Sequence, residues 1–144
     1  MKIVVAPNAL KGSLTAVDAA AAMAAGVRAA WPDAAVVEVP VADGGDGLVD
    51  VLAEALGGEE RVEEVDGPLD RPVRARWAWL PDEPAAVVEM ALASGLALLD
   101  DAERDPLAAT TRGTGQLLRA ALDRGARRLV VGIGGSATND GGAG

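Results

Sequence analysis

The first forty residues hold two short apolar runs on either side of one long alanine-rich segment, and this pattern constrains the fold most. Residues 2–6, KIVVA, form an almost unbroken apolar run, as in a strand buried within a parallel sheet. Residues 14–31 are predicted to be helical, and Thr15 and Asp18 have the spacing of a capping box with Asp in place of Glu. Residues 34–40 predict a second strand. A strand–helix–strand order indicates an α/β fold with a parallel strand pair.

The pattern changes after residue 47. A helix is predicted at residues 48–56, and turn sequences rich in Pro, Asp and Gly then separate three short strand candidates. This order predicts an antiparallel meander rather than another β–α–β unit. The strands are expected at residues 59–67, 71–80 and 84–91, followed by a helix at 115–125 and a strand at 127–135. We place a domain boundary near residues 43–47, so that residues 1–45 belong to one α/β domain and residues 46–144 begin a second, mixed-sheet α/β domain.

Composition excludes several kinds of function. The 144 residues include no cysteine and no histidine, so this stretch holds no disulfide, no zinc–thiolate site and no Ser–His catalytic pair. The formal net charge of −9 and the low aromatic content of 2% disfavour nucleic acid and anionic membranes as partners. No apolar stretch approaches the length of a membrane span, so a cytoplasmic protein is expected.

Two loops join a predicted strand to a predicted helix, where α/β proteins commonly bind ligands. In the first, Asn8, Lys11 and Ser13 precede a helix start, whose amides and partial positive charge attract anions. In the second, DGGDG, Asp43 and Asp46 could hold Mg²⁺ or orient a hydroxyl. The alternatives are a solvated lysine on a capped helix and a tight turn in which Asp46 caps the next helix.

A third loop, GIGGSATNDGGAG at residues 132–144, follows the last predicted strand. Its backbone amides can form an anion nest, and it also carries Ser136, Asn139 and Asp140. Asp140 could bind a metal ion or accept a proton. Residues 132–137 also match the dinucleotide pattern G-x-G-x-x-A, although that pattern needs an acidic residue about 20 positions further on. The alternative without function is a flexible loop.

A fourth group of polar residues lies between the third strand candidate and the last helix. Glu89 and Ser94 follow an apolar run, and Thr111, Gly113 and Thr114 precede the helix. The alternative is that Thr114 only caps this helix. Four loops of Gly, Ser, Thr and Asp without Cys or His favour positioning and charge stabilisation. Phosphoryl transfer requires amides and cations on the phosphates, Mg²⁺, and a carboxylate near the nucleophile.

Taken together, these stretches resemble the motifs of bacterial glycerate kinases of the glycerate 2-kinase type, in order along the whole chain. The matching stretches are VVAPNALKGSL, VADGGDG, VEMALASGL, TTRGTGQLL and GIGGSATNDGGAG. The resemblance implies a kinase that uses ATP and Mg²⁺ to phosphorylate D-glycerate, with 2-phosphoglycerate as the expected product. It also implies a flavodoxin-like domain with a second mixed-sheet α/β domain inserted in it, the two facing each other across a cleft. Family members continue well past the glycine-rich loop, so this chain is expected to be an N-terminal portion that is inactive alone.

On this interpretation, Asp140, Asp43 and Lys11 are the candidate catalytic residues, and the two aspartates are also the candidate metal ligands. Nucleotide or cofactor contacts are expected from Gly134, Gly135, Ser136, Asn139 and Ser13, and substrate contacts from Asn8, Glu89, Ser94, Thr111, Gly113 and Thr114. The sequence departs from the usual family pattern at Asn8, Asp46 and Arg112, which replace Asp, Glu and an aromatic residue respectively.

Two other functions remain open at this point. A dinucleotide-dependent oxidoreductase could use the loop from Gly132 to Ala137, although the predicted meander before that loop counts against it. Alternatively, the chain could have no catalytic role and act only as a folding or assembly unit.

Overall fold

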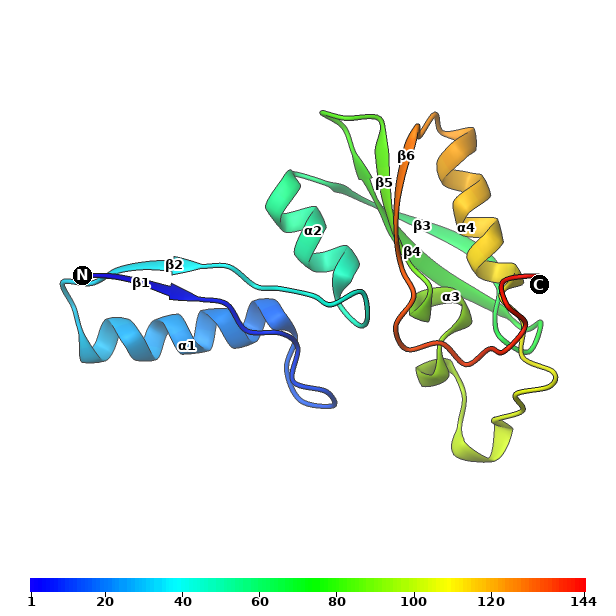
Figure 1. Ribbon diagram of the computed structural model, residues 1–144, viewed down its shortest axis with the longest axis horizontal. Helices are drawn as coiled ribbons and strands as arrows, with labels where there is room; N and C mark the ends of the chain where they lie inside the picture. Colours follow the sequence, from blue (N-terminus) through cyan, green and yellow to red (C-terminus); the bar gives the residue numbers. More distant parts are fainter. The chain divides into compact units, whose positions relative to one another are not determined.

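The computed structural model describes residues 1–144, and the chain divides into two compact units, Met1–Asp43 and Gly44–Gly144. Both units are mixtures of helix and strand, as the sequence predicts (Figure 1). None of the helices combines the length and apolar character needed to cross a lipid bilayer.

The first unit is a β–α–β motif. Its strands pair in parallel, from Lys2 opposite Ala35 to Val5 opposite Glu38, and the helix between them packs against the pair (Figure 1). The helix buries four small residues, Ala16, Ala19, Ala20 and Ala24. The three elements are β1 (Lys2–Val5), α1 (Ala16–Ala30) and β2 (Ala35–Glu38).

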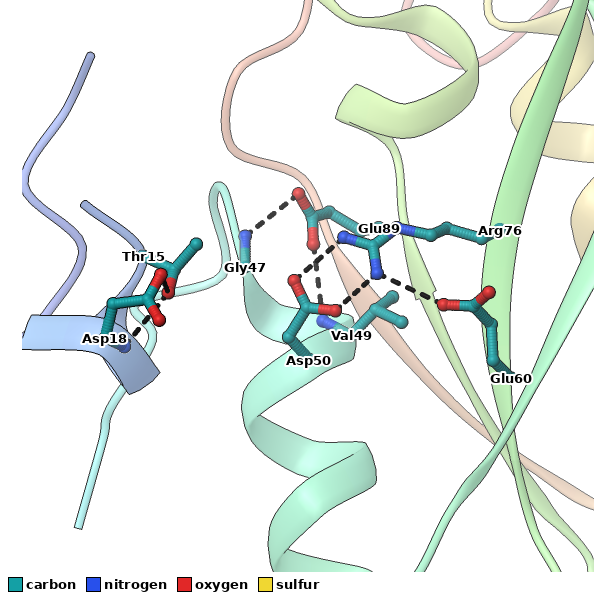
Figure 2. Close-up of polar contacts among 8 residues, drawn as sticks. All are labelled: Thr15, Asp18, Gly47, Val49, Asp50, Glu60, Arg76 and Glu89. Carbon is teal, nitrogen blue, oxygen red and sulfur yellow. Dashed lines mark hydrogen bonds and ion pairs between the residues drawn. The ribbon is translucent and has the colours of Figure 1, made fainter. Parts of the chain in front are cut away.

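Thr15 and Asp18 cap the start of α1, as predicted, but Asp18 bonds to the Thr15 side chain. The Thr15 hydroxyl accepts a hydrogen bond from the backbone N–H of Asp18 at 3.1 Å (Figure 2). The same hydroxyl donates to the Asp18 carboxylate at 2.7 Å. Asp18 therefore contacts the side chain of the capping residue, because its carboxylate is one methylene shorter than the Glu of a standard capping box.

The second unit is built on a four-stranded mixed sheet with the order β3-β4-β5-β6. The first three strands form the predicted antiparallel meander, and β6 pairs in parallel with β5. The strands are β3 (Glu59–Asp66), β4 (Pro72–Leu80), β5 (Ala85–Glu89) and β6 (Arg128–Gly132). The third strand ends two residues before its predicted end, because the chain turns there into the short helix α3 (Ala91–Ser94).

Two longer helices cover the two faces of this sheet (Figure 1). Helix α2 (Leu48–Leu56) contacts β4 and β5, and α4 (Arg112–Asp123) contacts β3 and β5. Side chains alternate between faces along a strand, so Trp77 of β4 lies in the core under α4 while Arg76 points to α2. Two 3₁₀ turns, η1 (Leu96–Leu98) and η2 (Asp101–Glu103), lie between α3 and α4.

The main core of the second unit is built without phenylalanine or tyrosine. Trp77 is its largest fully buried side chain, at 1% exposure. Small alanines and branched residues fill the space around it, so the sheet and α4 approach closely. The core consists of Val65, Ala75, Trp77, Ala86, Val88, Ala93, Leu117, Ala121 and Ala126.

Candidate functional site

The glycine-rich loop follows β6 and is held by backbone hydrogen bonds to two other segments of the second unit. The N–H of Gly134 donates to the carbonyl of Gly44 at 2.8 Å. Further along, the carbonyl of Gly135 accepts from Leu96 N–H at 2.8 Å, and Ala137 N–H donates to the Ser94 carbonyl at 3.0 Å. The loop is therefore an ordered part of the unit, positioned against the DGGDG segment on one side and against α3 and η1 on the other.

Two glycines are needed for this close approach. A Cβ at Gly132 would lie 2.6 Å from the Leu48 side chain and 2.7 Å from the Gly44 carbonyl oxygen. A Cβ at Gly134 would lie 2.5 Å from the Cα of Gly45. These distances are shorter than van der Waals contact, so a side chain at either position would push the two loops apart.

Asp140 is bound to the start of α4. Its Oδ2 accepts from the backbone N–H of Thr111 at 2.7 Å and from the Thr111 hydroxyl at 2.9 Å, while Oδ1 accepts from Gly142 N–H at 3.1 Å. The Thr111 hydroxyl also accepts from the N–H of Gly144 at 3.3 Å. These bonds, above all the one from the Thr111 backbone, hold the pKa of Asp140 below its ordinary value. Asp140 is therefore a carboxylate anion, which suits charge stabilisation or metal binding better than proton abstraction.

Ser94 and Thr114 meet in the interior of the second unit. Ser94 has no exposed surface and Thr114 only 5%, and their hydroxyl oxygens lie 2.9 Å apart. Helix α4 begins at Arg112, so Thr114 lies inside the first turn and is not the helix cap. Neighbouring Gly113 is also buried, and a Cβ there would lie 1.8 Å from the Asp66 carbonyl oxygen. These three residues bring the start of α4 against α3 and the end of β3.

Glu89 ends β5 and reaches the amino end of α2 (Figure 2). It is 3% exposed; one carboxylate oxygen accepts from Gly47 N–H at 3.2 Å and the other from Val49 N–H at 3.3 Å. Burial raises the pKa of Glu89 above its ordinary value.

The capping residue of α2 is Gly47, at φ 89°, and Asp46 makes no capping bond. The alternative that Asp46 caps this helix is therefore wrong, because Glu89 from a distant strand takes that place.

Two further charged residues contribute to this region; the sequence singles out Asp46 in the DGGDG segment but gives no role to Arg76. Asp46 is exposed, and a Cβ on Gly135 would lie 3.1 Å from its carboxylate oxygen, so Asp46 lies beside the glycine-rich loop. Arg76 donates to Asp50 of α2 at 2.8 Å and to Glu60 of β3 at 3.2 Å (Figure 2). The hydrogen bond with Asp50 is the largest cause that raises the pKa of this guanidinium further above its ordinary value. The alternation along β4 places Arg76 on the same face as Ala78 and Leu80. This pattern is the one sequence signal that could have predicted that Arg76 faces α2.

The remaining candidate residues lie in the first unit. Asn8 accepts from Ala9 N–H at 2.7 Å, and a turn follows in which Ser13 N–H donates to the Leu10 carbonyl at 2.9 Å. The side chains of Lys11 and Ser13 are exposed in this turn before α1. Asp43 is the last residue of the unit and is also exposed. The candidates thus divide between the units, and Asp43 and Asp140 belong to different ones.

The oxygen chemistry present suits Mg²⁺ in the second unit. No group of three or more acidic residues gathers into a metal centre. Mg²⁺ is usually held by only one or two protein carboxylates together with substrate phosphates and water. Asp140 keeps free lone pairs on Oδ1, which accepts only one hydrogen bond, and the exposed Asp46 carboxylate lies against the same loop.

The loop lacks the context of a dinucleotide-binding fingerprint. That fingerprint places its glycines at a helix start, where free amides receive the pyrophosphate. Residues 133–144 contain no helix, and the Gly134 amide already donates to Gly44. The oxidoreductase interpretation therefore loses its structural support.

Comparisons with known proteins agree with the motifs. The model of the Glycerate kinase family matches residues 3–144. All 144 residues align at 53% identity with a glycerate kinase of Bacillus subtilis strain 168, and at 52% with a glycerate 2-kinase of Escherichia coli strain K12. A solved structure from Salmonella typhimurium LT2, provisionally assigned as glycerate kinase 2, covers the whole chain with a TM-score of 0.84 and 50% identity.

The chain spans only part of these proteins. It corresponds to 38% of the length of the Bacillus and Escherichia relatives, and to 38% of the Salmonella chain. The family match nevertheless covers nearly every residue of the chain, including all five motifs and both compact units. The chain therefore belongs to the glycerate kinase family.

Proposed function

We propose that the protein to which these residues belong is a cytoplasmic kinase that transfers the γ-phosphoryl group of ATP to D-glycerate, giving 2-phosphoglycerate. The observation that carries this proposal is the family match over residues 3–144. The 2-phosphate is proposed because the Escherichia relative, 52% identical, is named a glycerate 2-kinase. In this reaction a hydroxyl oxygen of glycerate attacks the γ-phosphorus, the bond to the β–γ bridging oxygen breaks, and ADP leaves. The hydroxyl proton passes to a carboxylate or to solvent.

The geometry of the second unit supports a phosphate-binding role for the glycine-rich loop. We propose that amides of Gly134 or Gly135 and the polar groups of Ser136 and Asn139 contact phosphate or carboxylate oxygens. Gly134 N–H already donates to Gly44, so the Gly135 amide is the better donor of the two. The Ser136 hydroxyl accepts from Thr138 N–H at 3.0 Å, which orients it within the loop. Preorganised donors of this kind stabilise developing charge without rearranging during the reaction.

We propose that Asp140 holds Mg²⁺ or orients the nucleophile, with Asp46 as a further carboxylate beside the loop. Asp43, in the first unit, is the other proposed carboxylate for either role. Bound Mg²⁺ would supply the positive charge that a chain of net charge −9 needs to accept two anionic substrates. Lys11 and Ser13 in the turn before α1 would contribute anion binding from the first unit. Asn8 and Thr111 would contact glycerate, while Ser94, Gly113 and Thr114 would shape the substrate pocket from behind.

Activity of the complete gene product tests this proposal. ADP release should require D-glycerate, ATP and Mg²⁺ together, and phosphorus–proton NMR correlation should place the phosphate on the C2 oxygen. Residues 1–144 alone should release no ADP above the blank, because they represent 38% of the relatives' length. ADP release that does not depend on glycerate would reject the proposed substrate, and oxidation of glycerate by NAD⁺ or NADP⁺ would restore the oxidoreductase alternative.

A further inference from the structure

Glu89 is a buried carboxylate whose hydrogen-bond partners are backbone amides. Its two oxygens accept from Gly47 and Val49, and the acidic groups of Asp46 and Asp50 are close enough to raise its pKa along with burial. A buried anion beside two other acids is costly unless a specific partner compensates. That partner is the amino end of α2, where unpaired N–H groups and the helix dipole favour negative charge.

This arrangement has a consequence for ligand binding. The N–H groups at the start of a helix are a common site for phosphate or carboxylate, and the DGGDG segment leads directly into such a start. In this fold the chain's own Glu89 already occupies the amides of Gly47 and Val49. An anionic substrate therefore finds these two donors taken, and Glu89 itself, at 3% exposure, is out of reach of a ligand in solution.

The segment that Glu89 holds is also the segment that supports the glycine-rich loop. Gly44, three residues before Gly47, accepts the hydrogen bond from Gly134 at 2.8 Å. On the other side, Met90 follows Glu89 directly and donates its N–H to the Gly132 carbonyl at 2.9 Å. The carboxylate of Glu89 and the backbone of Met90 thus fix both partners of the contact between the two loops.

We propose that Glu89 is a positioning residue that sets the glycine-rich loop through the DGGDG segment, and that it does not contact substrate. This inference rests on the proposed function for its kinetic consequence, but not for the geometry on which it is built. The sequence predicted a substrate contact for Glu89. In place of that role, we assign its carboxylate to the N–H groups at the amino end of α2.

The test is Glu89→Gln in the complete gene product. Glutamine keeps the shape of the side chain, but its amide can accept only one of the two hydrogen bonds and presents an NH₂ donor to the other N–H. The loop should shift by a fraction of an ångström, and misplacement on that scale lowers kcat by about tenfold to a hundredfold. KM for ATP and for glycerate should stay within about twofold, because the substrate contacts themselves remain. The matched control is Glu64→Gln, which changes an exposed glutamate of β3 and should leave both constants unchanged.

Two further measurements extend the test, and the first of them does not depend on whether Glu89→Gln folds well. Gly134→Ala places a Cβ 2.5 Å from Gly45 Cα and disturbs the same loop contact without touching the carboxylate. It should reproduce the kinetic pattern, and the double variant should lose less than the product of the two single losses. Amide hydrogen exchange in peptides covering residues 44–49 and 132–135 should speed up in Glu89→Gln, but not in Glu64→Gln.

The outcomes separate the competing roles. A rise of tenfold or more in the KM for glycerate, with kcat unchanged, would make Glu89 a direct substrate contact and overturn the inference. Unchanged kinetics with unchanged exchange in residues 44–49 would overturn it as well. If the wild-type protein shows no kinase activity, the proposed function fails, and the exchange measurement alone decides whether Glu89 positions the two loops.

Discussion

The Asp140 carboxylate accepts two hydrogen bonds from Thr111, from the backbone N–H at 2.7 Å and from the hydroxyl at 2.9 Å. The two residues are 29 positions apart in sequence, so this contact closes the glycine-rich loop onto the start of α4. It also lowers the pKa of Asp140, which makes the carboxylate a weaker base.

Replacing Asp140 by asparagine should lower kcat in the complete gene product by at least about 10²-fold, the scale typical of a charge-stabilising or proton-transfer group. Asparagine can still accept from the Thr111 N–H, so the fold should survive. Steady-state kinetics and thermal unfolding measure both effects. Thr111→Val is the companion variant: it removes the hydroxyl bonds to Asp140 and Gly144 but keeps the backbone N–H bond. Because Thr111 is itself a proposed glycerate contact, only an equally large loss of kcat with the KM for glycerate unchanged would show that Asp140 acts by positioning the loop. Near-normal kcat in Asp140→Asn would move the role to Asp43.

Acid should reveal the lowered pKa of Asp140. The folded pKa lies below the ordinary value of 3.8, so on acidification the unfolded chain binds the proton first. The stabilisation from Asp140 is therefore present above about pH 4 and is lost as the pH falls through the folded pKa. The contribution of Glu89 to stability depends on pH in the opposite direction. Its pKa is raised from 4.5 in the folded state, so its contribution declines as the pH rises past that value through the folded pKa. Urea unfolding from pH 3 to pH 7 should show a shallower acid loss in Asp140→Asn, and an equally steep loss would contradict the assignment.

Two glycines of α4 should respond to alanine in opposite directions. A Cβ at Gly113 would lie 1.8 Å from the Asp66 carbonyl oxygen, so Gly113→Ala should destabilise the second unit by about 1–3 kcal/mol. A Cβ at Gly115 meets nothing within 4 Å, so Gly115→Ala should stabilise the helix by about 0.5–1 kcal/mol. Denaturant unfolding of both variants measures the difference, and equal effects would show that α4 does not approach β3 this closely.

Variants at Lys11 should show whether this lysine binds an anion or is only a solvated surface residue. If it holds a phosphate or the glycerate carboxylate, Lys11→Met should raise the KM of one substrate far more than that of the other. Lys11→Arg should rescue poorly, because a planar guanidinium differs in shape from a compact ammonium. Full kinetics for both substrates decide the matter. If both variants have the kcat and KM of the wild type, and the free energy of unfolding changes by less than about 0.5 kcal/mol, Lys11 is only a solvated surface residue in the turn before α1.

Local signals in the sequence predicted the elements whose ends are set locally. The helix predicted at residues 48–56 is found at Leu48–Leu56, because the glycines on both sides, Gly47 and Gly57, adopt positive φ and end it. By contrast, α4 begins three residues before its predicted start. Gly113 lies inside this helix although glycine is a poor helix former, because any side chain there would collide with the end of β3. Local helix propensity contains no information about that contact.

The site was predicted as a set of loops, but not as a set of contacts. Each polar loop lies at the end of a strand or the start of a helix, as the sequence indicates. The pairing of Ser94 with Thr114, and of Glu89 with Gly47 42 residues away, depends on how α2, α3 and β5 pack. A motif records which residues occur together in a family, and it does not record which of them face the ligand.

Tryptophan positions give this chain a built-in optical readout of the unfolding of its second unit. Because the chain has three tryptophans and no tyrosine, its near-ultraviolet absorption and fluorescence come almost entirely from indole. Trp31 belongs to the first unit and is 55% exposed, whereas Trp77 is 1% exposed in the core of the second. Emission of Trp31 comes from a ring already in water, so it changes little on unfolding, while the emission of Trp77 moves to longer wavelength when its core opens. A red shift on heating or in denaturant therefore reports loss of the sheet that carries the glycine-rich loop, with no added label.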